Sequence, residues 1–65
     1  MKVAIVVFDG VQALDVAGPL DVFAEANTYL SEHQRYQVSV VACDAGTVSC
    51  SNGMQLSVPF GFADF

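Results

Sequence analysis

Basic residues are nearly absent from this 65-residue chain, which has only Lys2 and Arg35 against seven acidic residues and a formal net charge of −5. A surface of this sign repels the phosphate backbone of DNA or RNA and releases no counterions from it. The composition therefore excludes nucleic-acid binding through this segment. Contacts with DNA would need a separate basic domain, carboxy-terminal to these residues.

Long apolar runs are also missing. The longest extends from Val3 to Phe8, far below the ~20 residues that span a bilayer, which argues against a membrane partner. Asp9 follows at once, where a signal peptide would have small neutral residues before its cleavage site. We therefore expect a cytoplasmic protein.

Cysteine is scarce, and the two thiols, Cys43 and Cys50, belong to no CxxC pair and no His/Cys cluster. A cytoplasmic location disfavours a disulfide, so we expect two free thiols and no metal site. Cys43 is followed by the acid Asp44, and no base lies beside it to activate the thiol. Gly10 and Gly18 are too far apart for a phosphate-binding loop, so no nucleotide cofactor is expected.

The apolar patterning that remains predicts an α/β fold. Residues 3–8 are apolar at every position and rich in β-branched side chains, which is typical of a central strand covered on both faces in a parallel sheet. Residues 36–42 alternate apolar and polar side chains and predict a second strand nearer an edge. Residues 9–35 between them contain a helix, so the two strands should be parallel in a right-handed βαβ unit.

Apolar side chains at steps of three and four between residues 16 and 30 predict an amphipathic helix. Proline fits the first turn of a helix but not its interior, so regular helix is expected from Gly18-Pro19 to about residue 31, after an irregular entry over 11–17. Asp21 would then lie in the first turn, where the helix dipole stabilises an acid. His33 falls in a polar loop over 31–35 and should face solvent.

Asn52-Gly53 lies between two short extended pieces, 48–50 and 54–58, and predicts a hairpin whose two turn residues adopt the positive φ of a type I′ turn. Pro59 should end the second of these strands. Aromatic residues then follow with no element to cover them: Phe60, Phe62 and Phe65. We interpret residues 1–65 as the amino-terminal portion of a single domain, and we expect it to form a homo-oligomer.

Ligands of an open parallel sheet bind beyond the carboxyl ends of its strands, so the turn after residues 3–8 is the expected site. The candidate catalytic group is the Asp15 carboxylate, and the candidate residues of a ligand pocket are Asp9, Gly10, Gly18 and Pro19. Structural alternatives exist for both acids. Asp9-Gly10 is ordinary turn chemistry, and Asp15 could accept backbone N–H groups as a helix cap.

The tract from Val3 to Phe23, with Leu14-Asp15-Val16-Ala17-Gly18-Pro19 inside it, resembles the amino-terminal signature of the ThiJ/PfpI superfamily, whose domains are similar to class I glutamine amidotransferases. Residues 36–41, residues 51–56 and Pro59 follow the order of strand, hairpin and strand in that family. The resemblance implies a flavodoxin-like three-layer α/β sandwich, of which only the first β-α-β portion and a hairpin are present.

Two branches of the superfamily match best: isonitrile-hydratase-like enzymes, and AraC-type transcription regulators with a carboxy-terminal DNA-binding domain. Residues 8–12, 21–27 and 50–53 are more similar to the regulators, which implies a domain that senses a small-molecule ligand. In members of the family, the acid that matches Asp15 faces a cysteine on a strand-to-helix elbow, a position beyond Phe65 that neither Cys43 nor Cys50 matches. That acid would tune the thiolate or act as general acid–base. A non-catalytic chaperone or stress protein of the same fold is a third alternative.

Overall fold

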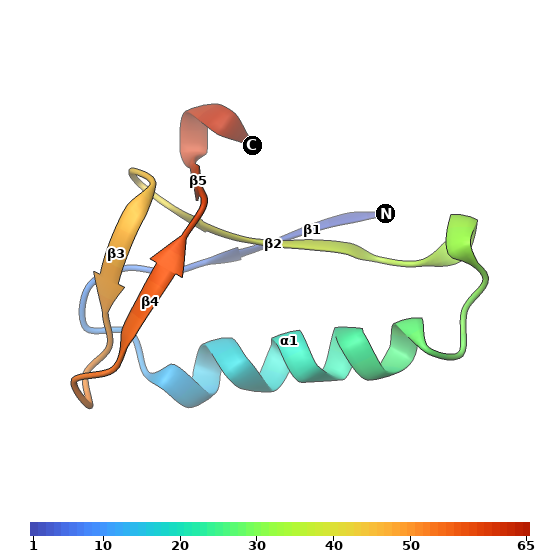
Figure 1. Cartoon of the computed structure of the whole chain (residues 1–65), viewed down its shortest axis with the longest axis horizontal. Coiled ribbons are helices and arrows are strands. Elements are labelled where there is room, and N and C mark those ends of the chain that lie inside the picture. Colours follow the sequence, from blue (N-terminus) through green and yellow to red (C-terminus); the bar gives the residue numbers. More distant parts are fainter.

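The computed structural model describes residues 1–65 as a three-stranded parallel sheet, one long helix and a two-stranded antiparallel hairpin (Figure 1). This arrangement confirms the predicted α/β class. Its elements in chain order are β1 (Lys2–Val6), α1 (Ala13–Asn27), η1 (Glu32–Gln34), β2 (Gln37–Ala42), β3 (Gly46–Ser49), β4 (Gln55–Val58), β5 (Phe60–Gly61) and η2 (Phe62–Asp64).

Strands β1 and β2 are parallel, as predicted, in a register that pairs Lys2 with Gln37 and Val6 with Val41. The short strand β5 pairs with the other edge of β2, so the order is β1-β2-β5. Within these residues β2 is the middle strand and β1 an edge strand, the reverse of the positions predicted from the apolar patterns. A continuous apolar run shows that both faces of a strand are apolar, but it does not reveal which strands lie beside it.

The core lies on one face of the sheet, where α1 covers β1 and β2 (Figure 1). Alternate residues along β1 and just beyond its end point to this face, including Ile5 and the fully buried Val7. The opposite face is open, since Val6 is 54% and Phe8 is 61% exposed. The expected cover on both faces of β1 is therefore absent within these residues. The buried core is formed by Val7, Val11, Val16, Ala42, Val48, Cys50 and Val58.

Helix α1 begins at Ala13 and contains Pro19 in its interior, so the expected start at Gly18-Pro19 was wrong. Proline has no N–H, and the carbonyl of Asp15 consequently loses its usual donor four residues later. Packing outweighs this loss, because the early turns bury Val16 and bring Leu20 against the core. Asp21 is accordingly mid-helix, and Asp15 is the acid in the first turn.

Helix α1 ends at Asn27, earlier than expected, and the chain passes through a turn and η1 before it enters β2. The Arg35 Nε donates to the carbonyls of Asn27 and Leu30, each at 3.1 Å, and satisfies backbone groups that the helix end leaves free. His33 lies in η1 and is exposed, as predicted. No helix of the protein is both long enough and apolar enough to span a bilayer.

The predicted hairpin is confirmed as β3 and β4, with Thr47 opposite Ser57. Its turn is not the expected type I′, because only Gly53 has a positive φ, at 91°. The Cys50 N–H donates to the Met54 carbonyl at 2.7 Å, which leaves a loop of three residues between them. Loops of this length place a single glycine in the left-handed region. Asn52 instead uses its Oδ1 to accept from the Met54 N–H, at 3.0 Å.

Candidate functional site

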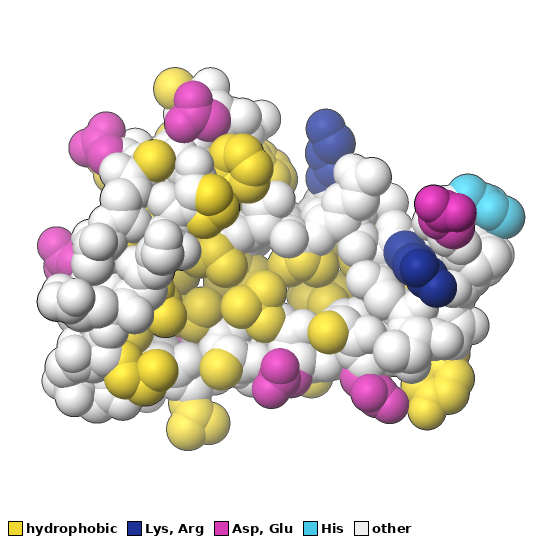
Figure 2. All heavy atoms as spheres, in the orientation of Figure 1, with side chains coloured by type: hydrophobic (Ala, Val, Ile, Leu, Met, Phe, Trp, Pro, Cys, Tyr) yellow, Lys and Arg dark blue, Asp and Glu magenta, His cyan; other side chains and the backbone are white.

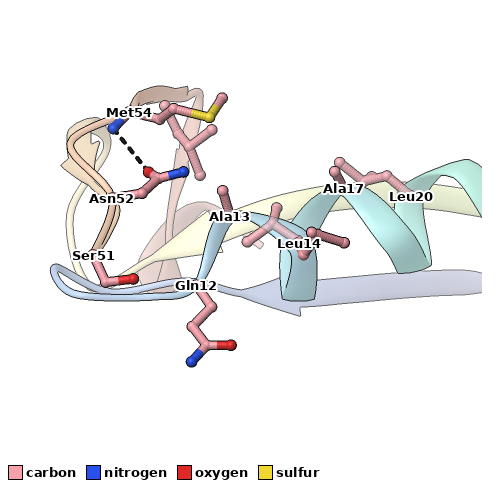
Figure 3. Close-up of a pocket in the computed structure, with 10 residues that line it drawn as sticks. Gln12, Ala13, Leu14, Ala17, Leu20, Ser51, Asn52 and Met54 are labelled. Atoms are coloured by element: carbon pink, nitrogen blue, oxygen red, sulfur yellow. Dashed lines mark hydrogen bonds between the residues drawn. The ribbon is translucent and has the colours of Figure 1, made fainter.

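Two hollows on the molecule are large enough for a small molecule. The first, the strand-end pocket, has a volume of about 460 Å³ and is lined by Val6, Val7, Phe8, Asp9, Ala42, Cys43, Asp44, Ala45, Thr47, Val48 and Phe62. The second, the helix–hairpin groove, has a volume of about 500 Å³ and is lined by Gln12, Ala13, Leu14, Val16, Ala17, Leu20, Ser51, Asn52, Met54 and Leu56 (Figure 3).

Ionisable side chains distinguish the two hollows. The strand-end pocket contains two carboxylates, Asp9 and Asp44, and the exposed thiol of Cys43. The groove contains no ionisable side chain, although it is slightly larger. The strand-end pocket also lies where β1 and β2 present their carboxyl ends, which is where α/β sheets bind ligands. It is therefore the candidate functional site.

Asp9 connects the turn after β1 to the hairpin. Its Oδ1 accepts the backbone N–H of Ser49 at 3.0 Å, and the N–H of Gly10 donates to the Ser49 carbonyl at 2.8 Å. Gly10 has φ of 93°, a conformation that favours glycine, and the next residue, Val11, forms a parallel bridge with Cys50. Asp9 thus holds one wall of the pocket in place, while Gly10 turns the backbone and lies outside the lining.

The remaining predicted site residues lie on α1, outside both hollows: Asp15, Gly18 and Pro19. Asp15 is the third residue of the helix, and its side chain is exposed. The residue at the N-cap is Gln12, which makes no side-chain capping bond. The structure therefore brings Asp9 together with Cys43 and leaves Asp15 apart from them, free of a capping role.

Both cysteines are free thiols, as expected; Cys50 is buried in the core and Cys43 is exposed. No three His, Cys, Asp or Glu side chains are close enough to form a metal site. Asp9 is the one predicted pocket residue that lines this pocket, and the lining residues that sequence reasoning missed include Asp44 and Phe62. Asp44 follows the end of β2 as Asp9 follows the end of β1, so the rule that ligands bind at the carboxyl ends of strands could have identified it. Phe62 lines the pocket only because of the path of the backbone after β5.

Comparison with known proteins agrees with this architecture. The sequence model of the DJ-1/PfpI family matches residues 1–65. The chain is 42% identical over 53 residues to the protein described as "Uncharacterized protein in cpoL 5'region" from Streptomyces lividans, a match that covers 82% of this chain and 36% of that relative. The chain thus spans well under half of the relative's length. Because the family model matches the whole chain, the chain belongs to the DJ-1/PfpI family.

Proposed function

We propose that these residues form the amino-terminal part of a cytoplasmic, ligand-sensing domain of an AraC-type transcription regulator. The observation that carries the proposal is the strand-end pocket, a hollow of about 460 Å³ with mostly apolar walls and a few convergent polar groups. The similarity of residues 8–12, 21–27 and 50–53 to the regulators supports it. DNA binding would come from a separate basic domain, because this segment has a net charge of −5.

The pocket also indicates a chemical class of ligand. The side chains of Phe8 and Phe62 offer aromatic surface, since they are 61% and 55% exposed. The carboxylates of Asp9 and Asp44 repel an anion and attract a cation. A small aromatic amine fits these walls better than a small aromatic acid.

Three probes of similar shape test the pocket: benzylamine, benzyl alcohol and benzoate. In ¹H–¹⁵N spectra we expect benzylamine to shift the amides of Cys43, Asp44 and Phe62, with a weaker effect of benzyl alcohol and none of benzoate. Shifts from benzoate as large as those from benzylamine would contradict the proposal. In the longer protein, DNA binding that weakens steeply with salt would support the regulator.

The alternative is an isonitrile-hydratase-like enzyme, which the exposed carboxylate of Asp15 favours because no capping bond occupies it. In such an enzyme Asp15 would transfer a proton as water adds to the terminal carbon of an isonitrile, giving an N-substituted formamide. The test uses the longer protein and a small alkyl isonitrile, with the formamide followed by NMR. Formamide formation that Asp15→Asn abolishes would establish the enzyme, whereas the regulator would form none.

A further inference from the structure

The loop of the hairpin holds an asparagine directly before a glycine. Asn52 and Gly53 are both exposed, between the last residue before the loop, Cys50, and the first after it, Met54. The side-chain carbonyl carbon of an asparagine lies within reach of the next backbone nitrogen, because a bond between them closes a five-membered ring. Glycine has no Cβ to obstruct that approach. An electrophile and a nucleophile therefore occupy neighbouring residues of a mobile kind of segment.

The hydrogen bonds of the loop favour attack on the Asn52 side chain. Its Oδ1 accepts the Met54 N–H at 3.0 Å, and this donor would stabilise the negative charge that forms on Oδ1 during the attack (Figure 3). Its Nδ2, the group that would leave, makes no hydrogen bond. The Gly53 N–H donates to the Cys50 carbonyl at 3.0 Å, and this bond must open first. Exposed turns open locally at little cost in free energy.

The only other asparagine of the chain, Asn27, is held in the opposite way. Its Nδ2 donates to the Tyr36 carbonyl at 3.0 Å, and its Oδ1 accepts the Tyr36 N–H at 2.8 Å. The nitrogen that would attack belongs to Thr28, whose β-branched side chain crowds the approach and whose N–H donates to the Glu25 carbonyl at 3.1 Å. Both the leaving group and the nucleophile are fixed here, so the chain contains its own matched control.

We propose that Asn52 is a modification site, at which the chain deamidates without an enzyme through a cyclic imide. The Gly53 nitrogen loses its proton and bonds to the side-chain carbonyl carbon of Asn52. The bond from that carbon to Nδ2 breaks, and Nδ2 takes up a proton and leaves as ammonia. Water then adds to either carbonyl carbon of the imide ring and breaks its bond to the ring nitrogen. One opening gives aspartate and the other gives isoaspartate, and water is the only reagent consumed.

This reaction changes the chemistry of the helix–hairpin groove. Asn52 is one of its lining residues, and none of them is ionisable. Figure 2 shows hydrophobic side chains in the hollow between the hairpin and α1, with acidic side chains at the margins. Either product places a carboxylate in this lining and makes the net charge of −5 more negative by one. Isoaspartate also adds a methylene group to the backbone of the loop. The modification is independent of the ligand proposed for the strand-end pocket.

Peptide mapping by mass spectrometry tests the proposal on the whole chain, kept folded in mildly alkaline buffer. We expect Asn52 to convert to a mixture of aspartate and isoaspartate about tenfold or more faster than Asn27 converts. The rate should rise with pH, because the Gly53 nitrogen must lose its proton. In ¹⁸O-enriched water one labelled oxygen should enter each product, since water opens the imide ring. Because this comparison is made within one molecule, it requires no variant to fold.

Asn52→Gln is the matched variant. It keeps a neutral amide, but attack on it must close a six-membered ring, so position 52 should remain unconverted while circular dichroism shows the wild-type fold. Conversion of Asn52 no faster than that of Asn27 would overturn the proposal. Aspartate without isoaspartate would also overturn it, because direct attack of water on the side chain gives aspartate alone.

Discussion

Asp9 shows how one side chain can serve both the backbone and a pocket. Its Oδ1 lies 3.0 Å from the Ser49 nitrogen, and the residue also lines the strand-end pocket. Sequence reasoning gave these two roles as alternatives, turn or pocket. In the structure one carboxylate oxygen accepts the hydrogen bond and the same residue lines the pocket, so Asp9 has both roles.

Substitution of Asp9 should therefore affect stability before it affects binding. Asp9→Ala removes the acceptor for the Ser49 N–H and should lower the free energy of unfolding by about 1 kcal/mol, while Asp9→Asn keeps an acceptor and should cost less. Urea unfolding at a fixed chain concentration measures both. Asp44→Ala is the control, because Asp44 is exposed and accepts no such bond from the hairpin. Equal losses in the Asp9→Ala and Asp44→Ala variants would show that the bond contributes nothing.

Substitutions of Asp15 should affect stability only through charge, because its side chain makes no capping bond and lies near the positive end of the helix dipole. We expect Asp15→Asn and Asp15→Ala to lower the free energy of unfolding by similar amounts, about 0.3–1 kcal/mol, and less at high salt. Urea unfolding with and without added sodium chloride measures the effect. A loss confined to Asp15→Ala and insensitive to salt would instead indicate a hydrogen-bonded cap.

Among the strands, β5 is the one that no sequence pattern predicted, and Gly61 explains why it can form. A side chain at this position would lie 3.2 Å from the Cys43 carbonyl oxygen and 3.3 Å from the Ala45 nitrogen. A Cβ atom here would be tighter than nearly all real contacts, so glycine lets the strand approach the backbone that leaves β2 without displacing it. Two residues are too short for any periodicity, so this pairing depends on a tertiary contact that the sequence does not reveal.

A pair of glycine substitutions tests this reading of β5. Gly61→Ala places a methyl group against backbone atoms that cannot turn away, and should cost about 1–3 kcal/mol of stability. Gly18→Ala meets nothing within 4 Å inside α1 and should stabilise by up to about 1 kcal/mol through helix propensity. Thermal unfolding of both variants at one concentration is the measurement. The reading fails if Gly61→Ala melts at or above the wild-type temperature.

Other elements show where sequence patterns predict structure and where they fail. Apolar patterning predicted both long strands and the helix, because each of these buries an apolar face in the core, and Asn52-Gly53 predicted the hairpin. The proline rule failed at the helix start, where the packing of Val16 outweighs the local penalty of Pro19. At the site, Asp9 was predictable because it directly follows a strand. Phe62 was not predictable, because its place in the pocket depends on how the chain folds after β5, which no sequence pattern indicates.

The molecule as a whole exposes more surface than its mass requires. Its accessible surface is 4574 Å², whereas a monomer of 6.9 kDa should expose roughly 4,000 Å². The radius of gyration is 12.5 Å against about 10.7 Å for a folded domain of this length. The open face of the sheet, with Val6 and Phe8 more than half exposed, accounts for part of the excess. A three-layer sandwich would need a second layer of helices over this face.

An uncharged dye can test this open face, because the net charge of −5 does not affect its binding. We expect Nile red to fluoresce strongly with the wild type, and Phe8→Gln with Phe62→Gln to reduce the fluorescence severalfold, since both exposed aromatic side chains line the strand-end pocket. Tyr29→Gln, at a residue 81% exposed in the turn after α1, is the control and should change little. In a longer protein that supplies the second helical layer, the fluorescence should fall, because that layer would cover the open face outside the strand-end pocket. Persistence of strong dye binding there would mean that the second layer does not cover this face, and that the three-layer sandwich is the wrong architecture for the whole domain.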